Sequence, residues 1–134
     1  MNSKQFLVIG GIILVVVGIL GWINVLGPTA DSSIFGSGWW FDTAENWAHF
    51  VLGIVALVVA FLLPASTHKP IVIVVGIIAI LAALYNLAGT KLLGANLESP
   101  ADLILHLVIG LWALYAALNK RKATPTAPNT SMPM

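Results

Sequence analysis

The sequence has no cysteine and very few charged residues. The absence of cysteine excludes disulfide bonds, thiolate metal sites and a cysteine nucleophile. Charged residues make up 8% of the 134 residues, whereas soluble domains contain about 25%. Hydrophobic residues make up 59%, which is more apolar surface than a soluble protein of this length can bury. The composition therefore predicts an integral membrane protein, with the lipid bilayer as a partner that covers its apolar surface.

Sequence signatures of several functions are also missing. No serine lies in a Gly-x-Ser-x-Gly context, and the chain has neither a phosphate-binding loop nor an HExxH zinc motif. It has no nucleic-acid-binding signature either, so nucleic acid is not an expected partner. These absences argue against classical hydrolysis. The sequence does not predict an enzyme, and no residue is assigned a catalytic role.

The chain does contain four long apolar runs, at residues 6–26, 44–63, 71–89 and 100–118. Each is long enough, or nearly so, to cross a hydrocarbon core of ~30 Å at ~1.5 Å per residue. No run alternates apolar and polar residues as a barrel strand does. Because backbone groups in lipid must then pair within their own segment, the four runs are predicted to be helices.

The predicted fold class is all-α, an integral membrane four-helix up-down bundle. A single membrane domain is expected over residues 1–122. The polar, proline-containing residues 123–134 are expected to form a flexible tail.

The positions of lysine and arginine predict the orientation in the membrane. Lys4, Lys69 and the basic run 120–122 lie at the span ends shared by both termini and the middle loop. Only Lys91 lies at the opposite ends, together with all five acidic residues. Because cytoplasmic loops are enriched in lysine and arginine, we expect both termini in the cytoplasm, at a prokaryotic plasma membrane. Four tryptophans near the outer ends are expected to form an aromatic belt: Trp22, Trp39, Trp40 and Trp47.

Two segments of the chain are similar, DTAENWAHFVLGIVAL at residues 42–57 and SPADLILHLVIGLWAL at residues 99–114. In both, an acidic residue is followed after four positions by a histidine and after four more by a glycine: Glu45, His49 and Gly53 in the first copy, and Asp102, His106 and Gly110 in the second. The upstream stretches INVLG and YNLAG align as well and pair Asn24 with Asn86. We therefore predict a helical hairpin used twice, as a parallel repeat.

Most polar side chains of the predicted spans fall on one level, near the outer ends. They are Asn24, Glu45, Asn46, His49, Asn86, Asp102 and His106. In an up-down bundle the second and fourth spans sit diagonally, so their equivalent residues can meet at the bundle axis. We call Glu45, His49, Asp102 and His106 the His/carboxylate cluster.

Part of this pattern has a purely structural explanation. Asp42-x-x-Glu45 and Ser99-x-x-Asp102 have the spacing of a helix capping box, and Pro100 suits the first helical position. Glycines such as those of the repeat let membrane helices approach closely. A histidine and a carboxylate four residues apart share one helix face, so each pair is also compatible with a structural hydrogen bond.

A functional explanation rests on the depth of the histidines. Ionisable groups within a membrane span are rare and usually face a bundle interior or a water-filled cavity. The leading prediction is a non-enzymatic membrane protein, an accessory or binding module, with the outward-facing His/carboxylate cluster as its working surface. A membrane-protein partner or a homo-oligomer is compatible with this prediction.

Two alternatives remain open. In the first, the protein binds a cofactor. A metal ion such as zinc or iron is then held by Glu45, His49, Asp102 and His106. Otherwise a tetrapyrrole, haem or chlorophyll, has His49 and His106 as axial ligands, with Gly53 and Gly110 leaving room for its flat ring. In the second alternative, the cluster handles protons or cations for a transporter.

At ENWAHFVLG and PADLILHLVIG the chain resembles a family of small prokaryotic four-span membrane proteins of unknown function. Members have a duplicated His-x-x-x-Gly helical hairpin. The matching residues are Asn46, His49 and Gly53 in the first copy, and Asp102, His106 and Gly110 in the second. The resemblance covers the four spans but not the tail or the long first loop. It implies the four-span fold and the repeat, and it supplies no activity.

Overall fold

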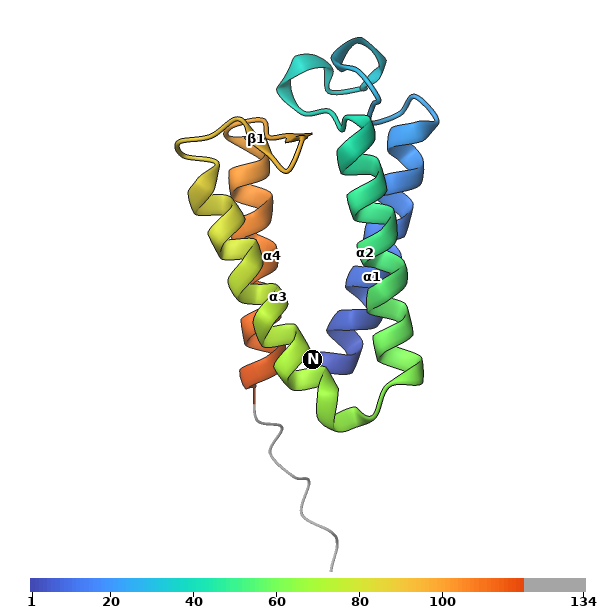
Figure 1. Cartoon of the computed structure of the whole chain (residues 1–134), viewed down its shortest axis with the longest axis vertical. Coiled ribbons are helices and arrows are strands. Elements are labelled where there is room, and N and C mark those ends of the chain that lie inside the picture. The colour runs from blue at the N-terminus through green and yellow to red at the C-terminus, as the bar shows by residue number, and fades with distance from the viewer. Residues whose placement is uncertain (120–134) are drawn as a thin grey trace, which may run out of the picture.

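A computed structural model of the chain describes residues 1–119, which form four helices (Figure 1). The helices are α1 (Ser3–Trp22), α2 (Thr43–Leu62), α3 (Ala65–Tyr85) and α4 (Ala101–Leu118). The predicted tail at residues 123–134 and the basic run 120–122 lie outside the described residues. The all-helical fold with four long helices is confirmed.

Two long loops complete the described part of the chain. The first, residues 23–42, contains the short 3-10 helices η1 (Ala30–Ser32) and η2 (Gly36–Gly38). The other, residues 86–100, contains two strands that the sequence did not predict. These strands, β1 (Lys91–Leu92) and β2 (Ala95–Asn96), pair antiparallel.

All four helices are long and apolar enough to cross a membrane. Large hydrophobic side chains are exposed on every one of them, for example Ile12, Leu62, Ile78 and Leu111. Apolar side chains exposed along a whole helix are stable in lipid but not in water. The fold is therefore compatible with the membrane protein that the composition predicts.

Helix α1 lies closer to the N-terminus than the predicted span 6–26. Asn2 starts the helix, because its side chain accepts a hydrogen bond of 2.9 Å from the backbone N–H of Gln5. The Gln5 side chain accepts one of 3.0 Å from the backbone N–H of Asn2, which completes a capping box. Helix α1 ends at Trp22, before Asn24, whose φ of +62° is left-handed and does not continue a helix.

Helix α3 also begins earlier than predicted, at Ala65 instead of residue 71. The polar residues before 71 stabilise the helix start instead of forming a loop. The Thr67 hydroxyl donates to the Pro64 carbonyl at 2.8 Å, and Nε2 of the buried His68 donates to the Val59 carbonyl at 3.1 Å. Pro70 lies within this part of the helix.

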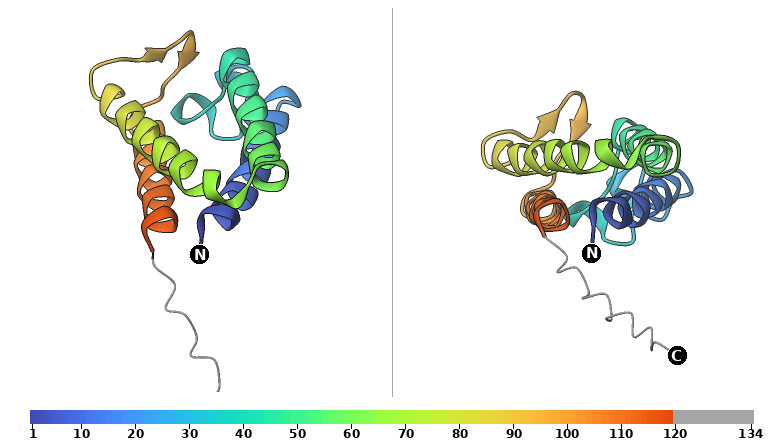
Figure 2. Two further views of the ribbon diagram at one scale, coloured as in Figure 1. Left: turned by 60° about the horizontal axis from the view of Figure 1, so that its bottom comes forward. Right: turned by 90° about the horizontal axis from the view of Figure 1, so that it is seen from below.

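The helices pack as two pairs, α1 along α2 and α3 along α4 (Figure 2). Facing glycines hold each pair close. A Cβ atom added to Gly53 would lie 2.7 Å from the carbonyl oxygen of Gly11, and one added to Gly110 would lie 3.0 Å from that of Gly76. The first distance is shorter than real Cβ atoms show and the second is tighter than nearly all real Cβ contacts, so the close spacing of each pair relies on these glycines.

The hydrophobic core lies at the end of the molecule where the N-terminus and the α2–α3 connection are found (Figure 1). All four helices contribute to it, with Phe6, Leu7, Val59, Ala60, Val72, Ala113, Ala116 and Ala117. Within it Phe6 packs edge-to-face on Trp112 at 4.7 Å between ring centroids. Toward the end that carries the long loops, the two helix pairs separate, so the packing there differs from that of a closed bundle.

Candidate functional site

A cavity of about 590 Å³ lies between the two helix pairs and is lined by all four helices and both long loops. One end of it is polar and aromatic, with Trp39, Phe41, Glu45, His49, Asp102 and His106. The remaining wall is apolar and extends to Phe6, Leu7 and Trp112, at the edge of the core. The site is therefore a mostly apolar chamber with one polar end.

The structure brings the whole His/carboxylate cluster to this one cavity. Glu45 and His49 come from the first turns of α2, and Asp102 and His106 come from the first turns of α4. The two histidines are near enough to interact electrostatically, and so are the two carboxyl groups. Residues separated by more than fifty positions thus line one cavity, and their joint role as a site stays a prediction.

Both histidines are held by a backbone hydrogen bond within their own helix. Nδ1 of His49 lies 2.8 Å from the carbonyl oxygen of Glu45, and Nδ1 of His106 lies 2.7 Å from that of Asp102. A carbonyl oxygen can only accept, so Nδ1 carries the hydrogen in both rings. In the neutral imidazole Nε2 is then a hydrogen-bond acceptor. Neither Nε2 atom, of His49 or of His106, has a hydrogen-bond partner within residues 1–119.

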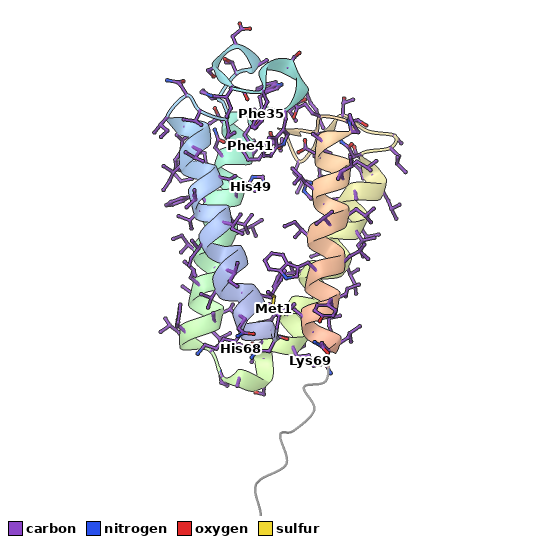
Figure 3. The ribbon with its side chains drawn as sticks, turned by 180° about the vertical axis from the view of Figure 1, so that it is seen from behind. Met1, Phe35, Phe41, His49, His68 and Lys69 are labelled. Atoms are coloured by element: carbon purple, nitrogen blue, oxygen red, sulfur yellow. The ribbon has the colours of Figure 1, made fainter. Side chains whose placement is uncertain are left out.

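The ring of His49 points into the space between the helix pairs (Figure 3). It stacks on Phe41, with 4.7 Å between centroids and 6° between ring planes. Phe41 is itself buried, and Trp39 packs edge-to-face on it at 5.1 Å. These three rings form a packed aromatic wall beside the polar end of the cavity.

Asp102 is only 2% exposed, and both of its carboxylate oxygens are already hydrogen-bonded. The indole Nε1 of Trp39 donates to Oδ1 at 3.0 Å, and the backbone N–H of Glu98 donates to Oδ2 at 2.7 Å. Asp102 therefore links the first loop to the start of α4. Trp39 contributes to this link through its N–H, and its place in an aromatic belt stays a prediction.

The start of α4 differs from the capping box predicted for Ser99 and Asp102. The N-cap position is held by Pro100, with no side-chain capping bond. Asp102 reaches back one residue further than the box requires, to the backbone of Glu98. The reason is that the N–H of Asp102 itself donates to the Glu98 carbonyl at 2.8 Å, which closes a turn around residues 98–102.

The capping box predicted at the start of α2 is confirmed. The side chain of Asp42 accepts from the backbone N–H of Glu45 at 2.8 Å, and Glu45 Oε2 accepts from the backbone N–H of Asp42 at 3.2 Å. The second oxygen of Asp42 accepts from the backbone N–H of Asn96, in β2, at 2.9 Å. The long loop before α4 is thus bound to the start of α2.

Glu98 belongs to this end of the molecule and was not predicted. Partial burial, and next the negative charge of Asp102, raise the pKa of its carboxyl from 4.5 to about 7. The side-chain amide of Asn96 donates to one of its oxygens. The sequence did contain a signal for Glu98, which lies four residues before Asp102. This spacing can place two like charges on one turn.

The asparagines named from the sequence do not line the cavity. Asn46 is fully buried between α1 and α2, where its side chain occupies the space beside Gly21. Asn86 is buried at the end of α3. Neither amide group has a hydrogen-bond partner in the described part of the chain. Asn24 is exposed and does not line the cavity.

Gly53 and Gly110 face the neighbouring helix of their own pair and are not part of the cavity wall. The interpretation that they leave room for a flat cofactor ring is therefore wrong. Their role is the close helix approach that was the structural explanation.

The closed metal site predicted from Glu45, His49, Asp102 and His106 is not formed. Among residues 1–119, no group of three or more histidine, aspartate or glutamate side chains lies close enough to hold a metal ion. Asp102 explains part of this result, since both of its oxygens are bound elsewhere.

No protein-family model matches the chain, and neither a curated protein nor a solved structure matches it. The fold alone defines the class of protein, an all-helical chain with four helices that are long and apolar enough to cross a membrane. The resemblance to a family with a duplicated hairpin remains a prediction from its motifs.

Proposed function

We propose that this chain is an integral membrane protein that binds a lipophilic ligand in the cavity between its two helix pairs. The observation that carries the proposal is the cavity itself, about 590 Å³ of mostly apolar space with its polar groups gathered at one end. This is the volume and the distribution of polar groups that small-molecule sites commonly have. The protein is a binding module in this proposal, and the His/carboxylate cluster orients the ligand.

The proposal includes the repeat, in which two hairpins form an up-down arrangement. Equivalent contacts in the two helix pairs support it. A Cβ atom on Gly11 would meet Leu57 at 3.0 Å, and one on Gly76 would meet Leu114 at 3.0 Å. Leu57 and Leu114 are the equivalent residues of the two similar sequence segments.

It also includes a prokaryotic plasma membrane with both termini in the cytoplasm. Because the chain lacks cysteine, single cysteines can report the orientation without background labelling. Ser37, in the first loop, and Ser66, at the start of α3, are both exposed. On intact cells, a membrane-impermeant maleimide is expected to label Ser37→Cys but not Ser66→Cys, which should react only after lysis. The reverse pattern would invert the proposed orientation.

The binding proposal is tested by filling the cavity. Ala48 lies on the cavity wall, and Val51, three residues on, is 49% exposed and does not line the cavity. Because Ala48 is exposed on the cavity wall, phenylalanine at position 48 is expected to extend into the cavity. Phenylalanine at position 51 is its matched control on the same helix.

The measurement is the unfolding temperature in detergent with increasing 1-decanol, because a ligand that binds the folded state raises this temperature. We expect the temperature to rise for the wild type and for Val51→Phe, and to rise much less for Ala48→Phe. All three proteins share the same micelles, so general effects of the alcohol cancel. An equal response from Ala48→Phe would contradict binding in the cavity.

A further inference from the structure

We propose that the ligand is a quinol, an aromatic ring with two hydroxyl groups and an alkyl tail, whose hydroxyls donate to Nε2 of His49 and of His106. This inference rests on the proposed function and specifies its ligand. Its tail would lie along the apolar wall between the helix pairs, in the direction of Trp112.

The polar end of the cavity offers acceptors. The Nδ1–H groups of His49 and His106 are directed to backbone carbonyls, which leaves each Nε2 as an acceptor toward the cavity. The one N–H of the Trp39 side chain is engaged by Asp102 at 3.0 Å. A ligand that brings hydroxyl donors therefore satisfies this end, whereas a ligand that brings only carbonyl oxygens leaves acceptors facing acceptors.

The carboxylates do not change this balance. Asp102 has both oxygens bound, by Trp39 and by the backbone of Glu98. Glu45 accepts from the backbone of Asp42 with Oε2. That bond leaves Oε1 of Glu45 as a further acceptor at this end. The two imidazoles are held in place by their Nδ1 hydrogen bonds, and their two Nε2 acceptors match the two hydroxyls of a quinol.

The aromatic wall argues for a flat ring over a simple alcohol. Phe41 and His49 are stacked with their planes 6° apart, and Trp39 completes the wall. A planar aromatic head can pack on these rings with favourable offset or edge-to-face geometry. An alkyl alcohol fills the apolar chamber and supplies one donor, but it gains nothing from this wall.

The test compares three probes that share a decyl chain: a decyl-substituted benzoquinol, its oxidised benzoquinone, and 1-decanol. Dissociation constants are measured by calorimetry on the purified protein in detergent, without oxygen. We expect the quinol to bind at least about tenfold more tightly than the quinone, because one unsatisfied hydrogen bond costs roughly that factor. We expect it also to bind more tightly than 1-decanol.

Variants locate the hydrogen bonds. His49→Leu and His106→Leu are each expected to weaken quinol binding about tenfold, while binding of the quinone changes little. His49→Gln keeps an acceptor oxygen and should retain part of the preference for quinol. His68→Gln is the matched control, since His68 lies at the opposite end of the molecule (Figure 3). Unfolding temperatures identify any variant that has not folded, and the comparison of probes on the wild type does not depend on the variants.

The outcomes separate this inference from the proposed function. Equal affinity for quinol and quinone, or tighter binding of 1-decanol, would overturn the quinol assignment while leaving a lipophilic site. Failure of all three probes to bind the wild type would overturn the proposed function as well. A stoichiometric haem spectrum in the purified protein, lost in both His→Leu variants, would also overturn the assignment, since the two Nε2 atoms would then be iron ligands.

Discussion

The indole nitrogen of Trp39 donates a hydrogen bond of 3.0 Å to Asp102, which lies 63 positions further along the chain. A second bond runs in the other direction, from the backbone N–H of Asn96 to Asp42 at 2.9 Å. The first loop is thus tied to the start of α4, and the loop before α4 is tied to the start of α2. These two bonds connect the helix pairs at the polar end of the cavity, away from the hydrophobic core.

Replacing Trp39 with phenylalanine tests the first of these bonds. Because Asp102 is buried, losing its indole donor is expected to lower the free energy of unfolding by about 1–3 kcal/mol. Unfolding in detergent, followed by circular dichroism, measures the change. Trp47→Phe is the control, since Trp47 is 55% exposed and packs edge-to-face on Trp22. Trp47→Phe is expected to lower the free energy of unfolding by about 1 kcal/mol or less. Equal decreases for the two variants would show that the Trp39–Asp102 bond does not stabilise the fold more than an ordinary aromatic contact.

Alanine at the facing glycines is expected to separate the helices of each pair. At Gly53 the new methyl group would lie 2.7 Å from backbone atoms of Gly11 and Val15, and neither can move without the helix. We expect Gly53→Ala to destabilise the protein by about 1–3 kcal/mol. Gly10→Ala, where no atom lies within 4 Å of the added Cβ, should be neutral or slightly stabilising through helix propensity. The midpoint of denaturation of each variant measures the change in stability. A midpoint for Gly53→Ala equal to that of Gly10→Ala would contradict the prediction.

The hydrogen bonds of the three histidines predict two tautomers in one protein. In the neutral state, His49 and His106 should carry the hydrogen on Nδ1, because each donates from it to a carbonyl. His68 should carry it on Nε2, which donates to Val59. Nitrogen-15 NMR of the labelled side chains distinguishes the tautomers directly. The Nε2 tautomer at His49 and His106 would remove the acceptors on which the proposed quinol site depends.

Glu98 predicts how stability changes with pH. Its pKa is 4.5 in an unfolded chain and about 7 in the folded protein, raised by burial and by Asp102. The folded state therefore holds the proton more tightly, and this contribution to stability is complete below pH 4.5 and lost as the pH rises through about 7. The unfolding temperature should fall between about pH 5 and pH 8, and less so in Glu98→Gln. An unchanged slope in Glu98→Gln would assign the effect to another group.

Much of the candidate site could be predicted because it follows from local spacing. Glu45 and His49 share a helix face by virtue of their four-residue separation, and so do Asp102 and His106. Because the two acid–histidine pairs occupy equivalent positions in two similar segments, they were expected to meet at the bundle axis. The structure places all four residues around one cavity, Glu45 and His49 on α2 and Asp102 and His106 on α4.

The errors concern the side-chain partners. The sequence alignment paired Asn24 with Asn86, but Asn24 is exposed and Asn86 is buried. The glycine contacts instead make Gly11 equivalent to Gly76. In that alignment of the two helix pairs, the position equivalent to Asn86 is Gly21. Short apolar segments align equally well in several registers, and only packing chooses among them.

The sequence by itself determined four apolar helices and the level at which their polar residues lie, because lipid requires each span to satisfy its own backbone. Tertiary structure alone decided which polar groups remain available. Asp102 is engaged by Trp39, and the histidines keep Nε2 for the cavity. The reason is physical: hydrogen-bond partners distant in the chain depend on helix rotation and loop path, which composition and periodicity leave undetermined.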